Sequence, residues 1–146
     1  MKQTIGIVGL GPMGKTIAIN LLGADFSVFG YDIRSELRYD LESYGGVSLS
    51  SITEIANSVD LLITSLPNSS ALDLVIDDVL KNPRTETVFI ETSTLTLDQK
   101  LKAAKRLGDD GISLLDCPIS GTPTMLANMT ASIYVSGDEE LYTNNL

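Results

Sequence analysis

The residues best suited to chemistry in this sequence form a glycine-rich loop near the amino terminus. The loop matches the pattern G-x-G-x-x-G and consists of Gly9, Leu10, Gly11, Pro12, Met13 and Gly14. Gly9 permits a tight turn, Gly11 lets the backbone approach a pyrophosphate, and Gly14 lets a helix pack closely on a strand. Pro12 suits the first helical turn, whose free N–H groups and dipole attract phosphates. The loop therefore predicts a dinucleotide-binding site.

An acidic residue follows close to the spacing of about 20 residues at which dinucleotide-binding folds carry one. Asp32 ends the second predicted strand, and a carboxylate there accepts hydrogen bonds from the adenosine ribose hydroxyls, which favours NAD. Ile33 and Arg34 continue the predicted cofactor loop, and the Arg34 guanidinium would instead suit the 2′-phosphate of NADP. NAD is favoured because Asp32 would repel that phosphate, and NADP stays open as the alternative.

The elements that must position these residues alternate along the whole chain. Apolar patterns predict strands at residues 4–8, 26–31, 47–49, 61–64, 87–90, 112–115 and 131–135. Helices are predicted at residues 13–22, 35–44 (closed by Gly45 and Gly46), 51–56, 70–80 and 97–107 (followed by Gly108). Residues 138–146 start like an acidic helix, but we expect no helix long enough to bury anything.

This alternation predicts an α/β fold, because parallel strands need long crossovers and helices are the usual ones. We expect a Rossmann-type, doubly wound and mostly parallel sheet in three layers, with residues 1–146 forming one dinucleotide-binding domain. The loops after the strands should meet at the carboxyl edge of the sheet, where such folds bind their ligands.

Composition excludes several classes of function. The formal net charge of −9 opposes binding to nucleic acid or to an anionic membrane. The apolar runs are short and no leader segment is visible, which predicts a cytoplasmic protein. The single cysteine, Cys117, is interpreted as a buried space-filler and excludes an internal disulfide. Because the chain has no histidine, imidazole metal sites and Ser-His or Cys-His catalysis are excluded, and no metal is expected.

Four segments together resemble the β-hydroxyacid dehydrogenase family, which includes 3-hydroxyisobutyrate dehydrogenase, tartronate semialdehyde reductase and, more distantly, 6-phosphogluconate dehydrogenase. These segments are residues 7–14 with 20–22, residues 64–68, residues 91–94 and residues 115–122. The resemblance implies hydride transfer between a nicotinamide cofactor and a small 3-hydroxyacid or semialdehyde. It further implies cofactor contacts from Leu66, Pro67 and Asn68, and from the Thr94 hydroxyl near the nicotinamide.

The fourth segment implies a substrate site on Ser120, Gly121 and Thr122, which match a Ser-Gly-Gly stretch of the family. Thr122 stands where the family has its second glycine, so a backbone with positive φ is harder to form there. Cys117 also replaces a small residue of the family.

The family's proton donor has no counterpart in these 146 residues. In the family, a lysine of a G-x-x-x-K-x-x-N motif lies on the helix after the Rossmann domain, and an all-helical second domain closes the site. None of the lysines here lies in such a motif, so no catalytic residue is assigned. We expect a truncated dehydrogenase that is inactive alone and associates with itself through exposed apolar surface. The alternatives are a stand-alone dinucleotide-binding or regulatory module without catalysis, and a structural Rossmann-like domain with an empty site.

Overall fold

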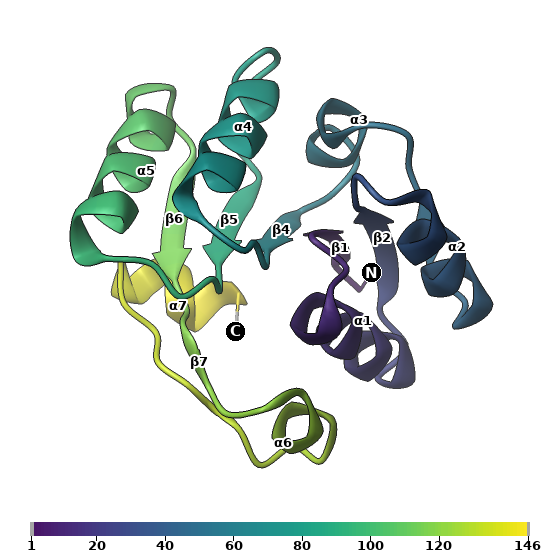
Figure 1. Cartoon of the computed structure of the whole chain (residues 1–146). Coiled ribbons are helices and arrows are strands. Elements are labelled where there is room, and N and C mark those ends of the chain that lie inside the picture. Colours follow the sequence, from purple (N-terminus) through teal and green to yellow (C-terminus); the bar gives the residue numbers. More distant parts are fainter. Residues whose placement is uncertain (1, 146) are drawn as a thin grey trace.

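Six parallel strands form the central sheet of the computed structural model, which describes residues 2–145 (Figure 1). The strands are β1 (Thr4–Val8), β2 (Ser27–Tyr31), β3 (Val47–Ser48), β4 (Leu61–Thr64), β5 (Val88–Glu91) and β6 (Ser113–Asp116). They lie in the order β3-β2-β1-β4-β5-β6. The direction of winding reverses between β1 and β4, and doubly wound sheets open their ligand crevice at this reversal.

Helices cover both faces of the sheet. They are α1 (Pro12–Gly23), α2 (Ser35–Ser43), α3 (Ile52–Ala56), α4 (Ser69–Val79), α5 (Leu97–Asp109) and α7 (Glu139–Asn145). Figure 1 shows α3, α4 and α5 over one face, with α1, α2 and α7 on the other. Two buried clusters match these layers, one around Phe89 under α3 to α5 and one around Ile7 under α1 and α2. The predicted three-layer Rossmann-type architecture is confirmed.

The central strands carry continuous apolar runs because helices bury them from both sides. Strands β4 and β5 are buried along their whole length. The register of strands β1, β4, β5 and β6 aligns Val8 with Thr64, Thr64 with Glu91, and Glu91 with Asp116. The carboxyl ends of β1, β4, β5 and β6 therefore form one continuous edge.

Helix starts follow local capping chemistry, whereas one predicted helix end is wrong. The Thr96 side chain accepts a hydrogen bond from the Gln99 N–H at 3.3 Å, and the Gln99 side chain accepts one from the Thr96 N–H at 3.0 Å. This capping box fixes the start of α5. At the other end, Gly108 does not end the helix, because α5 continues to Asp109. Gly111 provides the left-handed turn, with φ of 78°.

A long excursion, here called the arm, comprises residues 117–136 and leaves the sheet after β6. It runs out as β7 (Ile119–Ser120), turns through α6 (Pro123–Ala127) and returns as β8 (Ser132–Ile133), which pairs antiparallel with β7. Figure 1 shows the arm projecting from the sheet toward the side of α1. The predicted strand at residues 131–135 is present only as the two residues of β8, and β7 and α6 were not predicted. Two-residue strands and a short helix carry too little periodicity to be found.

The carboxyl-terminal helix α7 is seven residues long. The Asp138 side chain accepts a hydrogen bond from the Leu141 N–H at 2.9 Å and so caps the helix. Leu141 is partly buried against the cluster around Ile7, and no side chain of α7 is fully buried, in agreement with the expectation for this segment. Within residues 2–145, no helix has the length and apolar character needed to cross a membrane.

Candidate functional site

The three motif glycines differ in what a side chain would meet. A Cβ on Gly9 would lie 2.1 Å from the Ser65 carbonyl oxygen, and Gly9 has φ of 95°. A Cβ on Gly14 would lie 1.8 Å from the Gly9 carbonyl oxygen, whereas a Cβ on Gly11 would meet only Arg34 Nη2 at 3.9 Å. Gly9 and Gly14 are therefore required by packing. Gly11 leaves open space at the point where a pyrophosphate would approach the backbone.

Helix α1 begins directly at this loop. Pro12 occupies its first turn, and no side chain caps the helix at Gly11. The first-turn N–H groups have no partner within a helix and add to the positive end of the dipole. The Leu10 side chain is buried in the core, so Leu10 faces the loop through its backbone alone. The loop thus offers backbone N–H groups to an anion.

Asp32 connects the glycine loop to the end of β2. Its Oδ2 accepts a hydrogen bond from the Leu10 N–H at 2.9 Å, and its Oδ1 accepts bonds from the Arg34 N–H at 2.9 Å and from Arg34 Nε at 3.1 Å. Burial by itself would raise the pKa of Asp32, but the bonds from Arg34 and Leu10 outweigh burial and hold that pKa below its ordinary value. The carboxylate is ionised at neutral pH, as ribose recognition requires.

Two guanidinium groups lie beside Asp32. Arg34 is half exposed between Asp32 and Gly11, and its ion pair with Asp32 raises the pKa of Arg34. Arg38 donates a hydrogen bond from Nη1 to the Asp32 carbonyl oxygen at 2.8 Å. Ile33 is 85% exposed next to them. The structure therefore brings together Asp32, Ile33 and Arg34 as the sequence predicted, and the second cation, Arg38, was missed.

The loops after β4 and β5 lie on the other side of the point where the strand order reverses. The Leu66 N–H donates to Ser93 Oγ at 2.8 Å, which ties these two loops together. Thr94 is exposed beside Ser93, and Pro67 is exposed beside Leu66. Asn68 Oδ1 accepts a hydrogen bond from the Ala71 N–H at 2.9 Å and caps α4.

A buried ionic cluster lies at the ends of β4, β5 and β6. Glu91 is fully buried, and its carboxylate accepts hydrogen bonds from Thr64 Oγ1 and from the Ser93 N–H, both at 2.5 Å. Lys100 Nζ lies 2.5 Å from Asp116 Oδ1 and 3.7 Å from Glu91 Oε1. Within the described residues, no buried polar side-chain atom lacks a hydrogen-bond partner.

Sequence reasoning missed this cluster, although one signal was present. Lys100 falls on the same face of α5 as Ala103 and Leu107, and all three are buried. A lysine at that helical spacing indicates a cation that faces the core and needs an acidic partner there.

The predicted substrate residues lie on the arm, on an element separate from the glycine loop. Gly121 has φ of 148°, whereas Thr122 has φ of −94° and caps α6 by accepting a hydrogen bond from the Met125 N–H at 3.2 Å. Thr122, at the position where the family has a second glycine, therefore has a backbone conformation that any residue can adopt. Asn20 on α1 holds the arm by donating from Nδ2 to the Leu126 carbonyl oxygen at 2.9 Å.

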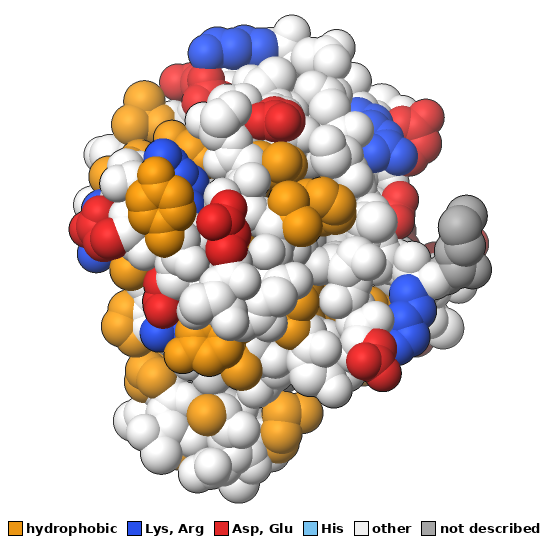
Figure 2. Space-filling model, turned by 90° about the vertical axis from the view of Figure 1, so that its right-hand side faces the viewer, with side chains coloured by type: hydrophobic (Ala, Val, Ile, Leu, Met, Phe, Trp, Pro, Cys, Tyr) orange, Lys and Arg blue, Asp and Glu red, His pale blue; other side chains and the backbone are white. Residues whose placement is uncertain are grey.

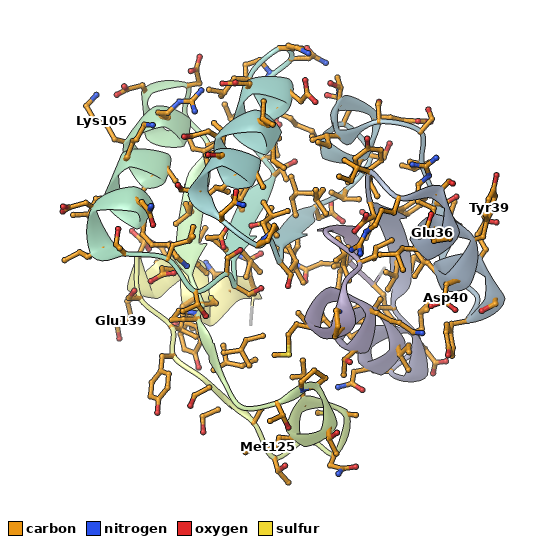
Figure 3. The ribbon with its side chains drawn as sticks, in the orientation of Figure 1. Glu36, Tyr39, Asp40, Lys105, Met125 and Glu139 are labelled. Atoms are coloured by element: carbon orange, nitrogen blue, oxygen red, sulfur yellow. The ribbon has the colours of Figure 1, made fainter. Side chains whose placement is uncertain are left out.

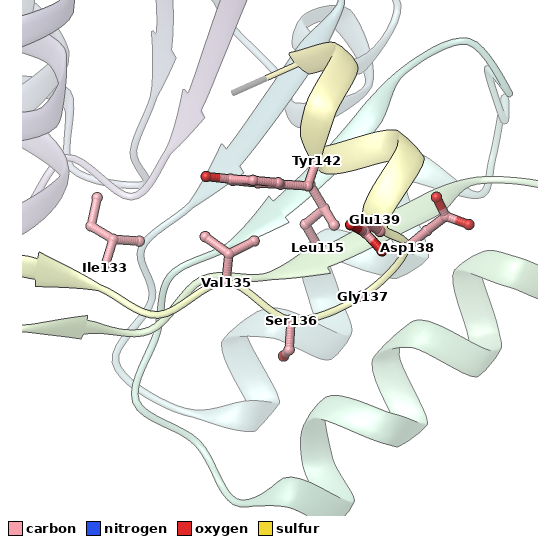
Figure 4. Close-up of a pocket in the computed structure, with 8 residues that line it drawn as sticks. All are labelled: Leu115, Ile133, Val135, Ser136, Gly137, Asp138, Glu139 and Tyr142. Atoms are coloured by element: carbon pink, nitrogen blue, oxygen red, sulfur yellow. The ribbon is translucent and has the colours of Figure 1, made fainter.

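A hollow of about 420 Å³ lies between the arm and α7 (Figure 4). Tyr142 spans it toward Val135 and Ile133, and Asp138 and Glu139 lie at one end. None of the predicted cofactor or substrate residues lines this hollow. Its two carboxylates would repel a phosphate, so the hollow is distinct from the predicted dinucleotide site.

Cys117 is buried at the base of the arm, as predicted for a space-filler. Burial and the nearby Asp116 carboxylate raise the pKa of Cys117 to about 11, so its thiol stays protonated at neutral pH. In the described part of the chain, no group of three or more His, Cys, Asp or Glu side chains could hold a metal ion.

Comparison with known proteins gives consistent matches over almost the whole chain. A family model described as the NAD binding domain of 6-phosphogluconate dehydrogenase matches residues 4–145. The mitochondrial 3-hydroxyisobutyrate dehydrogenase of Drosophila melanogaster is 30% identical over 141 residues, which cover 96% of this chain and 44% of that protein. The NAD-dependent L-serine dehydrogenase of Pseudomonas aeruginosa is 33% identical over 145 residues, which cover 96% of this chain and 48% of that protein.

A solved structure agrees with these matches. The structure of 3-hydroxyisobutyrate dehydrogenase from Mycobacterium tuberculosis with L-serine superposes with a TM-score of 0.94 at 30% identity. The match covers 99% of this chain and 50% of that one. The chain therefore spans about half the length of the curated relatives it matches.

Proposed function

Because this chain belongs to the family of the NAD binding domain of 6-phosphogluconate dehydrogenase, we propose that its glycine loop, Asp32 and the loops after β4 and β5 are the residues that hold NAD. The domain is an NAD-binding domain of 3-hydroxyisobutyrate dehydrogenase-like oxidoreductases. The pyrophosphate would lie against Gly11 and the amino terminus of α1, and the adenosine ribose against Asp32. Leu66, Pro67, Asn68 and Thr94 would border the other nucleotide.

The observation that carries this proposal is the position of Asp32. One carboxylate oxygen accepts a bond from Leu10 of the glycine loop and the other from Arg34, so the ribose acceptor and the pyrophosphate loop form one rigid unit. Its ionised state favours NAD, because the 2′-phosphate of NADP would meet a negative charge. Arg34 and Arg38 keep NADP as the weaker alternative ligand.

For the whole oxidoreductase, we propose hydride transfer between NAD and a small 3-hydroxyacid or its semialdehyde. The relatives named above act on 3-hydroxyisobutyrate and L-serine, each of which carries a carboxylate and a hydroxyl on its third carbon. The nicotinamide cofactor supplies or accepts the hydride, and the protein supplies position and charge. Ser120, Gly121 and Thr122 on the uncharged arm would contact the carboxylate or the hydroxyl.

The 146-residue chain alone should bind NAD without turning over. General acid–base catalysis is worth about 10² to 10⁴ in rate, and no lysine here lies in the family's proton-donor motif. Lys100 does not substitute, because it is buried and paired with two carboxylates. All residues proposed to bind NAD lie within these 146 residues, whereas none of their lysines lies in the family's proton-donor motif. A dinucleotide-binding module without catalysis is therefore the second candidate function.

We also propose that the arm mediates association with a second copy of the chain. Residues 117–136 contain no charged side chain, although the chain has a net charge of −9. On the face that Figure 2 shows, hydrophobic and uncharged polar side chains make up the lower end of the molecule. The exposed apolar residues of the arm and of α7 are Met125, Met129, Ile133, Tyr134, Val135 and Tyr142. Sedimentation at increasing concentration tests this, and a purely monomeric chain would contradict it.

Calorimetric titration with NAD⁺, NADH, NADP⁺ and NADPH tests the proposed function. We expect saturable binding that prefers the NAD forms and is lost in Gly11→Val and Asp32→Ala. Asp109→Ala is the matched control, because Asp109 is an exposed carboxylate on α5 that pairs with Lys105. Unchanged affinity in Asp32→Ala, or no binding of any of the four ligands by the unaltered chain, would refute the assignment.

A further inference from the structure

Lys100 is unusual for a lysine, because its side chain is buried and only 7% exposed. It reaches from α5 to the ends of two strands, with Nζ 2.5 Å from Asp116 on β6 and 3.7 Å from Glu91 on β5. A buried ion pair is weak evidence for stability, since well-packed apolar side chains of similar volume often serve as well or better. The contacts of the cluster, rather than its contribution to stability, therefore indicate why a lysine is buried here.

The two carboxylates hold the loops that leave the carboxyl edge of the sheet. Glu91 accepts a hydrogen bond from the Ser93 N–H, and Ser93 Oγ accepts one from the Leu66 N–H at 2.8 Å. The Glu91 carbonyl oxygen accepts a bond from the Cys117 N–H at 2.8 Å. Through these bonds, the loops after β4 and β5 and the base of the arm share one anchor.

The same cluster also fixes the return of the arm. Asp116 exchanges two backbone hydrogen bonds with Ser136, each of 2.9 Å. The side chain of Asp116 is at the same time held by Lys100. Both ends of the arm therefore meet at a residue that the buried cation contacts directly.

The position of the cluster in the sheet indicates what it serves. Doubly wound sheets bind the two halves of a dinucleotide on either side of the point where the strand order reverses. Here the reversal lies between β1 and β4. The glycine loop and Asp32 occupy the side of β1 and β2, so the second mononucleotide must lie over β4, β5 and β6, where Lys100 contacts the carboxylates that end β5 and β6.

We propose that Lys100 is a positioning residue for the nicotinamide ring of NAD. It holds the loops after β4 and β5 and the base of the arm in the shape that receives this ring, without contacting the ligand itself. The inference rests on the proposed NAD-binding function, and it concerns the nicotinamide end of the ligand only. The adenosine half depends on Gly11 and Asp32, neither of which contacts the cluster.

The test compares NAD⁺ with ADP-ribose, which retains the adenosine half and lacks the nicotinamide ring. Lys100→Met removes the cation and leaves two buried carboxylates without it. Asp116→Asn is the milder variant, because Lys100 still pairs with Glu91. This second variant tests the inference even if Lys100→Met unfolds the chain. Lys105→Met is the control, because Lys105 lies on the outer face of α5, 76% exposed and paired with Asp109 (Figure 3).

We expect the NAD⁺ affinity of Lys100→Met and of Asp116→Asn to fall about tenfold, which corresponds to about 1.4 kcal/mol. The ADP-ribose affinity of both variants should stay within about twofold of the unaltered chain. Lys100→Arg keeps the charge and should restore most of the NAD⁺ affinity. Lys105→Met should change neither ligand's affinity.

Amide hydrogen exchange gives a readout that needs no ligand. In Lys100→Met and Asp116→Asn, the amides of Leu66, Ser93 and Cys117 should lose protection, because their acceptors are held by the cluster. The amides of Leu10 and Lys15 should keep theirs, because they bond to Asp32 and Gly11. Protection lost equally at all five amides would indicate a global stability effect and would overturn the inference.

The titrations separate the two proposals. Equal loss of both ligands, or no loss of either, in the variants would overturn the role of Lys100 and leave the NAD site intact. Failure of the unaltered chain to bind either ligand would overturn the proposed function and the positioning role together. Selective loss of NAD⁺ affinity with retained ADP-ribose affinity would support both.

Discussion

The two sides of the proposed NAD site are built in opposite ways. On the side of β1 and β2, the site depends on the absence of side chains, because Gly9 and Gly14 leave no room for a Cβ. On the side of β4 to β6, it depends on a buried ion pair, with Glu91 and Lys100 beneath the loops. The first side therefore has a backbone shaped by sterics, and the second has loops held by charge and hydrogen bonds.

The difference matters for how each side responds to change. A steric contact between backbone atoms cannot relax by moving a side chain, so the glycine side should fail abruptly. A hydrogen-bonded ionic cluster can lose one member and keep the others, so the second side should weaken in steps. Four predictions, ordered from the largest expected effect to the smallest, test this contrast.

Gly14→Ala should have the largest effect on stability. Its Cβ would lie 1.8 Å from the Gly9 carbonyl oxygen, and the resulting backbone shift should lower the free energy of unfolding by about 4 kcal/mol. Gly11→Ala, whose Cβ has ordinary space, should change it by less than about 1 kcal/mol while weakening NAD⁺ binding. Urea denaturation followed by circular dichroism measures both. Equal losses in the two variants would contradict the steric account.

Glu91→Ala should be the most damaging single change on the other side. It leaves the Thr64 hydroxyl and the Ser93 N–H buried without their acceptor, which should cost about 3 kcal/mol of unfolding free energy. Glu86→Ala is the control, because Glu86 is 74% exposed and its ion pair with Arg84 spans 3.9 Å. If Glu91→Ala were as mild as Glu86→Ala, the buried cluster would have no part in holding the sheet edge.

Asp32→Asn should have a smaller effect that depends on pH. The pKa of Asp32 is lower in the folded chain than its ordinary value, so its contribution to stability is present above about pH 4 and is lost as pH falls through the folded pKa. At neutral pH we expect a loss of about 1 kcal/mol, because asparagine can still accept the Leu10 bond. Unfolding measured from about pH 7 down to pH 3 should show the unaltered chain and Asp32→Asn converging in acid. A constant difference across this range would count against the ionised carboxylate.

Cys117 should show the smallest effect, a slow chemical reaction without loss of fold. Its pKa of about 11 and its burial leave almost no exposed thiolate. Alkylation by iodoacetamide at about pH 8 should be less than about a tenth as fast in the native chain as in urea. Rapid native alkylation, measured by mass spectrometry, would mean that the base of the arm opens readily and is poorly held by Lys100 and Asp116.

The glycine side could be predicted from sequence because its information is local. The spacing from Gly9 to Gly14 and on to Asp32 is set by one strand, one turn and one helix, and the structure has all three where the pattern put them. Strands β1 and β4 were predicted to the residue, since continuous apolar runs between polar residues define buried parallel strands.

The other side could not be predicted as fully, because its information comes from residues far apart in the chain. The pairing of Lys100 with Asp116 depends on α5 packing beside β6, which no local pattern specifies. The hairpin of the arm was not predicted for a related reason, since β7 and β8 are two residues each and pair with each other across α6. Helical spacing in α5 was a signal that Lys100 is buried, but that spacing does not specify which acidic residue pairs with it.

The strand order has a consequence for synthesis on the ribosome. Strand β1 emerges first and pairs with β2 once residue 31 is free, but its other edge pairs with β4, which begins at Leu61. Until then the growing chain presents an open, apolar strand edge of the kind that recruits other chains. We expect nascent chains arrested between these points to need chaperone protection, and chains arrested beyond β5 to resist proteolysis through their β1 segment.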